Sequence, residues 1–229
     1  MLEKRKRISK REIKQDTLVT TYYKAYNFFM ENQLRIFIGV AAVALVVVAV
    51  VLYSSNKAKN NVTAAGLLSK VMPTYDAGQY KQAIDGQSTS NTVGLKEIVE
   101  KYGGTDAGET ARIMLANSYY NIGDYEAAFK NYDDYSGSIP LYKSTALAGK
   151  ALYYEWKKDF AKAADLYQEA SKISEADPSN AEYLMKAGID LMKIGKNEEA
   201  KAVFETVKQD YKTSTASQEV DKYLVQVQG

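Results

Sequence analysis

The sequence has 229 residues, of which 46% are hydrophobic and 25% are charged, and its formal net charge is +2 at pH 7. It contains no histidine and no cysteine, which excludes Ser-His-Asp and Cys-His nucleophiles, disulfides, and metal sites built from these residues. Because no carboxylate pair or glycine-rich phosphate loop stands in a recognisable context, we predict no catalytic residue, metal site, cofactor or small-molecule substrate.

The net charge hides an asymmetry between the two ends of the chain. Residues 1–35 hold nine Lys and Arg against four Asp and Glu, a net +5, which leaves −3 for residues 54–229. Seven of the nine cations lie in residues 4–14, KRKRISKREIK. We interpret residues 1–35 as a basic cytoplasmic tail that signals membrane topology, and we do not expect nucleic-acid binding because no domain presents the charges.

Aromatic residues follow the basic run at helical spacing. The pattern predicts an amphipathic helix at the cytoplasmic interface of a membrane, formed by Tyr22, Tyr23, Tyr26, Phe29 and Met30. A docking helix for a membrane partner is the alternative interpretation.

An uncharged segment of eighteen residues follows, IFIGVAAVALVVVAVVLY, from Ile36 to Tyr53. At about 1.5 Å per residue it nearly crosses a hydrocarbon core of about 30 Å, and Leu34 with the stem of Arg35 supplies the rest. A buried strand of this length would be about three times longer than usual. The segment therefore predicts a single transmembrane helix.

The basic tail also predicts the orientation of this helix. Lys57, Lys59 and Lys70 follow the span and favour the opposite orientation. A long following domain, however, crosses the membrane largely regardless of its charge, whereas a short basic tail is retained. We therefore expect a cytoplasmic N-terminus and a periplasmic or extracellular domain formed by residues 54–229.

This domain contains a repeated signature, in which a turn is followed by an alanine and then by an aromatic residue four positions later. The three copies are Gly123-Asp124-Tyr125 with Ala128 and Tyr132, Lys158-Asp159-Phe160 with Ala163 and Tyr167, and Gly195-Lys196-Asn197 with Ala200 and Phe204. An apolar stripe with small residues precedes each turn, which predicts pairs of closely crossing helices. A degenerate copy begins at Gly78-Gln79-Tyr80 with Ala83.

Other local signals complete the expected layout. Pro73 is expected to kink or end the preceding helix at Met72. Residues 86–94, GQSTSNTVG, are expected to form an inserted loop, and residues 94–104 a helix that ends at two glycines. Thr215 and Gln218 form an expected capping box for a last amphipathic helix that covers the final repeat, with an apolar stripe of Val220, Tyr223, Leu224 and Val227.

The signature resembles the tetratricopeptide repeat, whose second helix carries an A-x3-F pattern. Ala128-x3-Tyr132, Ala163-x3-Tyr167 and Ala200-x3-Phe204 match it, whereas Arg112, Leu147 and Leu184 replace the leading tryptophan of the first helix. The resemblance implies an all-α fold, in which the transmembrane helix precedes a helical-repeat solenoid with a C-terminal capping helix.

In such a solenoid the first helix of each pair lines the concave face. The repeat spacing places mainly apolar candidates for protein binding on this face: Ile113, Asn117, Tyr120, Leu152, Trp156, Met185, Ile189 and Met192. A groove with two methionines suits contact with a partner helix or an unfolded chain. The alternative is that the C-terminal helix fills the groove and makes these residues part of the core.

The complete layout resembles the ancillary subunit of the bacterial Sec translocon, in the version found in Bacteroidetes-type bacteria. The shared sequence features are YGGT (102–105), the GDY turn (123–125) and YKTSTASQEVDKYL (211–224). The resemblance implies a single-pass protein of the bacterial inner membrane with a periplasmic domain. It also implies association with the translocon and with a membrane-anchored periplasmic prolyl-isomerase-like chaperone. A tethered scaffold for cell-envelope assembly or another secretion complex, unconnected with Sec, is the alternative function.

Overall fold

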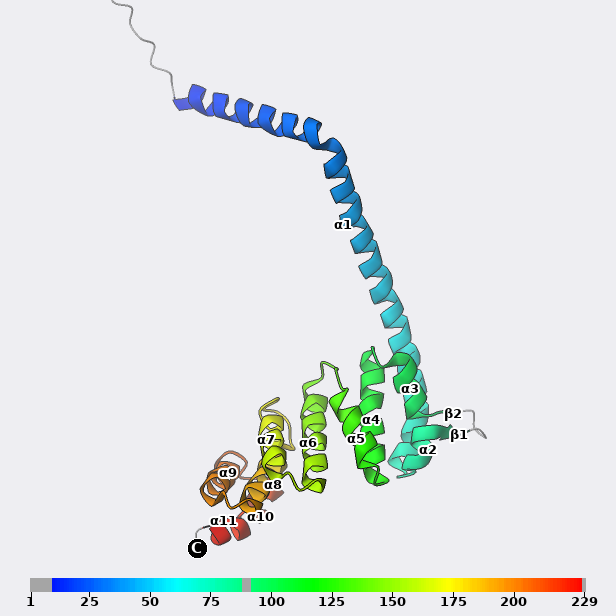
Figure 1. Cartoon of the computed structure of the whole chain (residues 1–229), viewed down its shortest axis with the longest axis vertical. Helices are drawn as coiled ribbons and strands as arrows, with labels where there is room; N and C mark the ends of the chain where they lie inside the picture. The colour runs from blue at the N-terminus through cyan, green and yellow to red at the C-terminus, as the bar shows by residue number, and fades with distance from the viewer. Residues whose placement is uncertain (1–9, 88–91, 228–229) are drawn as a thin grey trace, which may run out of the picture. The chain divides into compact units, whose positions relative to one another are not determined.

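The structure is a computed structural model that describes residues 10–87 and 92–227. The chain divides into two compact units, Met1–Asn56 and Lys57–Gly229. The regular elements of its described residues are helices and one two-stranded hairpin, so the fold is nearly all-α, as the sequence predicted (Figure 1).

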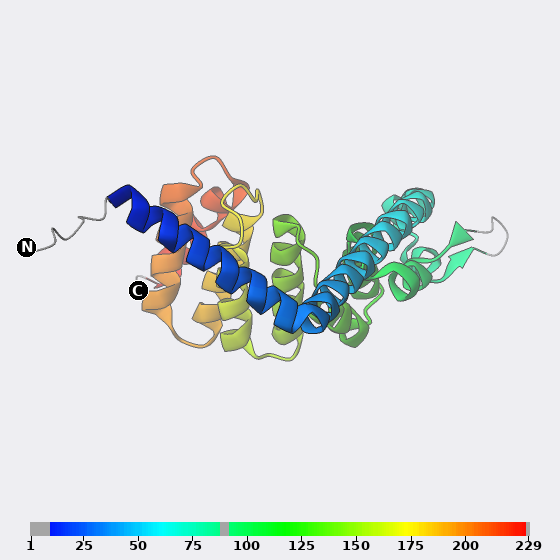
Figure 2. The same ribbon diagram turned by 90° about the horizontal axis from the view of Figure 1, so that it is seen from above.

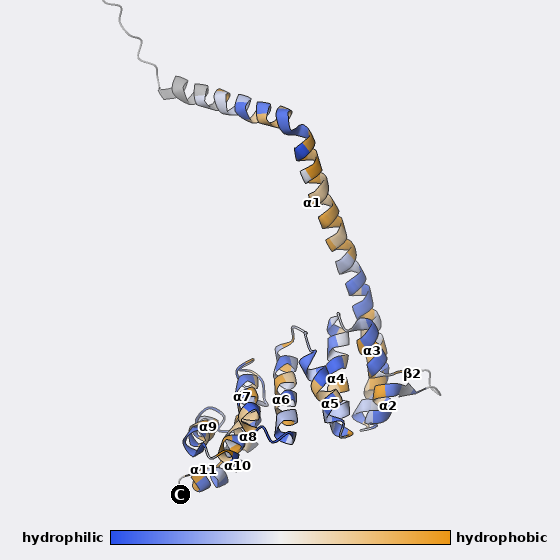
Figure 3. Cartoon of the chain, in the orientation of Figure 1, coloured by the Kyte–Doolittle hydropathy of each residue, from blue (hydrophilic) through white to orange (hydrophobic). Residues whose placement is uncertain are grey.

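Helix α1, Lys10–Asp76, begins in the first unit and ends in the second. Among the described residues it is the one helix that is long and apolar enough to cross a membrane, and its most apolar stretch has no buried residue. Figure 3 shows this stretch as a continuous hydrophobic segment of the helix. The structure thus confirms one apolar N-terminal helix of membrane-spanning length.

The regular geometry of α1 is interrupted at Asn32, where φ is −114° and ψ is 15°. The side-chain amide of Asn32 donates a hydrogen bond of 2.9 Å to the carbonyl oxygen of Phe28, the acceptor that the backbone N–H of residue 32 takes in a regular helix. The prediction that Pro73 kinks or ends the helix at Met72 is wrong, because α1 continues to Asp76 and its non-helical geometry lies at Asn32. Pro73 lies in the last turn, so its missing N–H removes a single bond close to the helix end.

The second unit continues with α2 (Tyr80–Asp85), β1 (Gly86–Gln87), β2 (Thr92–Val93), α3 (Leu95–Tyr102), α4 (Asp106–Asn121), α5 (Tyr125–Asp133), α6 (Pro140–Trp156), α7 (Phe160–Ala170), α8 (Asn180–Lys193), α9 (Asn197–Asp210), α10 (Thr215–Glu219) and α11 (Asp221–Val227). Consecutive helices from α3 to α9 pack against each other, and α10 and α11 pack against α9. Figures 1 and 2 show α4 to α9 side by side in chain order.

Four helix-to-helix junctions close with the same two backbone hydrogen bonds. At each junction one N–H donates to the carbonyl three residues earlier, and the next N–H donates to the carbonyl five residues before its own position. The first donor has a positive φ in every case: Gly78 (72°), Gly123 (83°), Lys158 (62°) and Gly195 (75°). These two hydrogen bonds, with the first donor residue in the left-handed backbone conformation, define the Schellman motif. The junctions at Gly123, Lys158 and Gly195 are the turns of the sequence signature. The junction at Gly78 is the turn of its degenerate copy.

Small residues and aromatic rings meet between the paired helices. A Cβ atom added to Gly188 of α8 would lie 2.3 Å from the ring of Phe204 of α9, so only glycine permits this approach. At the equivalent positions, Ala116 shares a buried cluster with Tyr132, and Ala151 shares one with Tyr167. The three signature alanines are also buried, with exposed fractions of 2% or less at Ala128, Ala163 and Ala200.

Two connections differ from the sequence expectation. Residues 86–94 include a hairpin in which Gly86 pairs with Val93 and Gln87 with Thr92, and residues 88–91 lie outside the described residues. At the C-terminus the cap is Ser214 rather than Thr215, because the Ser214 hydroxyl accepts the N–H of Ser217 at 3.1 Å. The expected last helix is divided into α10 and α11 at Val220, which is fully buried.

The Lys158 junction provides a stability test. Lys158 is the one described non-glycine residue with positive φ, and a side chain in this conformation costs about 1–2 kcal/mol. We expect Lys158→Gly to raise the free energy of unfolding by about 0.5–1 kcal/mol, after the entropic cost of glycine in the unfolded chain. Urea unfolding followed by circular dichroism measures the change.

Lys157→Gly is the matched control, because Lys157 has an ordinary right-handed conformation with φ −73°. This variant should be less stable than the parent chain. An equal shift in the same direction for both glycine variants would contradict the account of the junction.

Candidate functional site

Two of the predicted binding residues take part in packing between helices. Ile113 is 2% exposed and lies in the cluster that α4, α5 and α6 form around Tyr132. Asn117 donates to the Tyr75 hydroxyl at 3.3 Å and accepts from the Tyr132 hydroxyl at 2.6 Å. Burial raises the pKa of Tyr132 well above its ordinary value, so this hydroxyl remains a donor. Both residues therefore hold α4 in place rather than face solvent.

Tyr120 and Trp156 belong to an aromatic cluster at the α4–α5 and α6–α7 junctions, in which Trp156 is exposed and the other rings are half-buried. Ring centroids lie 5.4 Å apart for Tyr120 and Tyr125, 5.2 Å for Tyr125 and Trp156, and 5.6 Å for Tyr153 and Trp156. Lys157 lies over the Trp156 ring, with its ammonium 4.1 Å from the centroid. We call Tyr120, Tyr125, Tyr153 and Trp156 the aromatic surface.

Sequence reasoning missed two members of the aromatic surface. Tyr125 is the first residue of α5 and directly follows the Gly123-Asp124 turn, so its position at the helix end was visible in the signature. Tyr153 lies three residues before Trp156 on α6, and this spacing places both rings on the same side of a helix.

The other predicted residues are partly buried. Leu152, Ile189 and Met192 pack against the core cluster that includes Ala187 and Leu191. Met185 lines a hollow of about 460 Å³ between α8 and the start of α10, together with Ala181 and residues 213–216. Helix α11 packs on α9. The C-terminal segment thus lies beside Met185, whereas Trp156 is 44% exposed.

A polar network joins α6, α7 and α8 next to these apolar residues. The Lys193 ammonium bonds the Asp190 carboxylate at 2.8 Å and the Glu155 carboxylate at 3.5 Å. Glu155 also accepts the Tyr167 hydroxyl at 2.8 Å. Burial acts to lower the pKa of Lys193, but its bonds with Asp190 and Glu155 outweigh burial and raise this pKa. Two carboxylates therefore share one ammonium.

Asp190 is the member of the network whose carboxylate is incompletely paired. Its side chain is fully buried, and its Oδ2 atom has no hydrogen-bond partner among the residues that the structure describes. Burial first, and then the nearby Glu155, raise the pKa of Asp190 to about 6, although Lys193 opposes the shift. A carboxylate that is removed from water without a full set of hydrogen-bond partners is favoured in its protonated, neutral form. The sequence pattern did not predict this group, because it arises from three helices.

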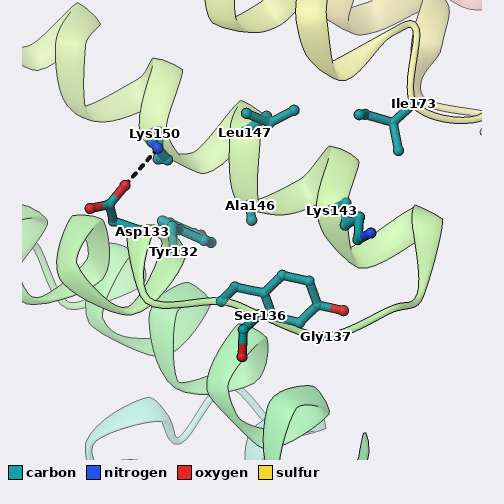
Figure 4. Close-up of a pocket in the computed structure, with 10 residues that line it drawn as sticks. Tyr132, Asp133, Ser136, Gly137, Lys143, Ala146, Leu147, Lys150 and Ile173 are labelled. Atoms are coloured by element: carbon teal, nitrogen blue, oxygen red, sulfur yellow. Dashed lines mark hydrogen bonds and ion pairs between the residues drawn. The ribbon is translucent and has the colours of Figure 1, made fainter.

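A second hollow, of about 290 Å³, lies between the end of α5, the loop that follows it and α6 (Figure 4). Leu147 and Ile173 form part of its apolar wall, and Lys150 is paired with Asp133 at 2.6 Å. No group of three His, Cys, Asp or Glu residues arranged to hold a metal ion occurs in the part of the chain that the structure describes.

The comparisons with known proteins add no family assignment. No protein-family model matches the chain, and no curated protein matches it. The features of the chain that bear on function are therefore the apolar segment of α1, the repeated junctions and the aromatic surface.

The Asp190 network predicts a pH dependence of stability. Because the folded-state pKa of Asp190 is about 6 and its reference value is 3.8, the folded chain binds more protons than the unfolded chain between these values. This contribution raises stability as pH falls from 7 toward 4, by roughly 1–3 kcal/mol. Urea unfolding at several pH values should show the effect as a difference between the parent chain and Asp190→Asn.

Asp165→Asn is the control, because Asp165 is an exposed aspartate on the adjacent helix α7. It should leave the pH profile of the parent chain unchanged. If Asp190→Asn has the same pH profile as the parent chain, Asp190 is already ionised at pH 6 and the network is mis-assigned.

Proposed function

We propose that this protein is a non-enzymatic, membrane-tethered scaffold that binds other proteins on the outer side of the bacterial inner membrane. The observation that carries the proposal is the apolar stretch of α1, which has membrane-spanning length and no buried residue, in a helix that continues into the first helix pair of the second unit. The span would hold the protein at the membrane, and the helix pairs would provide a surface that binds other proteins.

We interpret α4–α5, α6–α7 and α8–α9 as tetratricopeptide-like repeats, preceded by a degenerate pair that consists of the end of α1 and α2. The identical Schellman closures support this interpretation, as does the approach of Phe204 to Gly188 in the last pair. In the other two pairs Ala116 shares a buried cluster with Tyr132, and Ala151 shares one with Tyr167. Helices α10 and α11 serve as the terminal cap, because Val220 and Val227 are buried in the cluster that includes Phe204.

The basic tail supports a cytoplasmic N-terminus, and hence a periplasmic repeat domain. Residues 4–14 hold seven cations, and short basic segments beside a membrane span are retained on the cytoplasmic side. The proposed location is therefore the inner membrane, which the chain crosses once.

The aromatic surface is the proposed protein-binding site. Its four rings come from three different helices, and Trp156 is the large apolar residue that it exposes most. Aromatic side chains dominate the energetics of protein interfaces because each buries a large area at a small entropic cost. Such a surface can contact apolar segments of a partner helix or of a chain that has not yet folded.

The layout supports an ancillary role at the Sec translocon, in which the repeats contact emerging chains and pass them to periplasmic chaperones. The partners on this proposal are the translocon itself and a membrane-anchored prolyl-isomerase-like chaperone. Binding would involve two weak contacts, one in the membrane and one in the periplasm. Formation of either contact would raise the effective concentration of the partner at the other contact.

Crosslinking and co-purification from native membranes test this function. The parent chain is expected to recover the Sec channel in mild detergent. Trp156→Glu should reduce recovery severalfold without lowering the melting temperature, because exposed positions contribute little to stability. Leu141→Glu is the control, because Leu141 lies at the other end of α6 and is equally exposed, at 45% against 44%.

Exchange of residues 22–53 for an unrelated signal anchor should also lower recovery of the channel while the repeats remain folded. If no Sec component is recovered while other envelope proteins are recovered well, the translocon assignment is rejected and the more general scaffold remains. Equal loss of recovery in the Trp156 and Leu141 variants would argue against the aromatic surface as the binding site.

A further inference from the structure

The part of α1 that precedes Asn32 carries an aromatic face formed by Tyr22, Tyr26, Phe29 and Met30. Its large side chains are well exposed, with fractions of 66% for Tyr22, 47% for Tyr26, 42% for Phe29 and 49% for Met30. Tyr22 stacks on Tyr26 at 6.3 Å, and Phe29 meets Phe37 edge to face at 6.4 Å across the bend. These rings are ordered along one side of the helix, and the remainder of their surface is open.

Polar side chains concentrate at the bend, between the aromatic face and the apolar segment. Asn32 bonds the carbonyl of Phe28, and Arg35 donates to Asn32 Oδ1 at 3.4 Å. Figure 3 shows hydrophilic residues at the bend, directly before the hydrophobic stretch of α1. In a membrane protein, polar groups of this kind mark the headgroup level, because unsatisfied groups are costly within the hydrocarbon. The bend therefore divides a segment suited to the interface from one suited to the hydrocarbon.

We propose that α1 before Asn32 is a surface helix that binds anionic phospholipid in the leaflet next to the tail. The inference rests on the proposed membrane span, because the span brings this helix to the interface. Two further observations specify the occupant. The aromatic rings, two of which carry a hydroxyl at the edge, suit the boundary between headgroups and acyl chains, and residues 1–35 carry a net charge of +5.

The charge selects lipid over a second protein helix as the occupant. Residues 10–31 hold four cations and three acids, so most of the positive charge lies in residues 4–7, directly before the helix. An aromatic helix that follows such a basic segment gains from burial of its rings, while the segment gains from attraction to acidic headgroups. The attraction to the lipid surface decreases within about 10 Å at 0.1 M salt. The association of this helix with the bilayer should therefore depend on lipid charge and on salt, whereas insertion of the span should depend on neither.

The absence of cysteine from the chain makes single-site labelling specific. Full-length variants Tyr26→Cys, Thr21→Cys and Ala44→Cys are labelled with an environment-sensitive fluorophore and placed in nanodiscs. Residue 26 reports on the aromatic face, and residue 21 on the other side of the same helix, about 140° away. Residue 44 reports on the span. The bilayers contain phosphatidylcholine alone or an equal mixture with phosphatidylglycerol.

In the mixed bilayers we expect blue-shifted emission at residue 26 and iodide quenching several-fold weaker than at residue 21. High salt, bilayers without phosphatidylglycerol, or replacement of Lys4, Arg5, Lys6 and Arg7 by glutamine should reduce this protection. Residue 44 should stay protected under all of these conditions.

The three positions separate failure of this inference from failure of the span. Protection at residue 44 with equal quenching at residues 26 and 21 in mixed bilayers would overturn the surface helix and leave the span intact. This result would favour a protein partner for the aromatic face. Protection at residue 26 that does not change with lipid charge or salt would overturn the preference for anionic lipid. Quenching at residue 44 would overturn the span itself.

Discussion

The close contact between a small residue and an aromatic ring determines how the helix pairs of this protein pack. Gly188 admits the Phe204 ring where even a methyl group would clash, and Ala116 and Ala151 occupy the equivalent positions near Tyr132 and Tyr167. Because the small residue lets two helix backbones approach closely, the Schellman closures can join them with turns of few residues. The Tyr132 ring also lies against Gly149 of the following helix α6, and consecutive pairs pack in chain order.

This packing has consequences for the polar groups between the pairs. The rings of Tyr132 and Tyr167 are buried in the clusters that contain Ala116 and Ala151, and their hydroxyls donate to Asn117 and Glu155 of the first helices. The Glu155 carboxylate is thereby oriented toward Lys193 of α8, which also pairs with Asp190. A buried charge with an unpaired oxygen is costly, so the network links the stability of the α6–α8 region to pH. The aromatic surface lies next to the network, because Trp156 directly follows Glu155.

The parts predicted from the sequence are those that depend on local pattern. The length of the uncharged segment indicated the apolar helix, and the A-x3-aromatic spacing located the buried faces of α5, α7 and α9. Features that depend on competition between side chains and backbone were missed, such as the bend at Asn32 and the cap at Ser214. The Asp190 network and the burial of Ile113 were missed for another reason, because neighbouring helices decide both. Among the predicted binding residues, Tyr120 and Trp156 meet on one surface, whereas Asn117 is committed to internal hydrogen bonds.

The central claim is that one membrane span holds the repeat domain outside the cytoplasm. Protease accessibility in cells with a permeabilised outer envelope tests it most directly, with antibodies against each end of the chain. The account predicts digestion or release of residues 57–229 and protection of the basic tail. Protection of the repeat domain together with loss of the tail would contradict the account, because the aromatic surface would then face the cytoplasm.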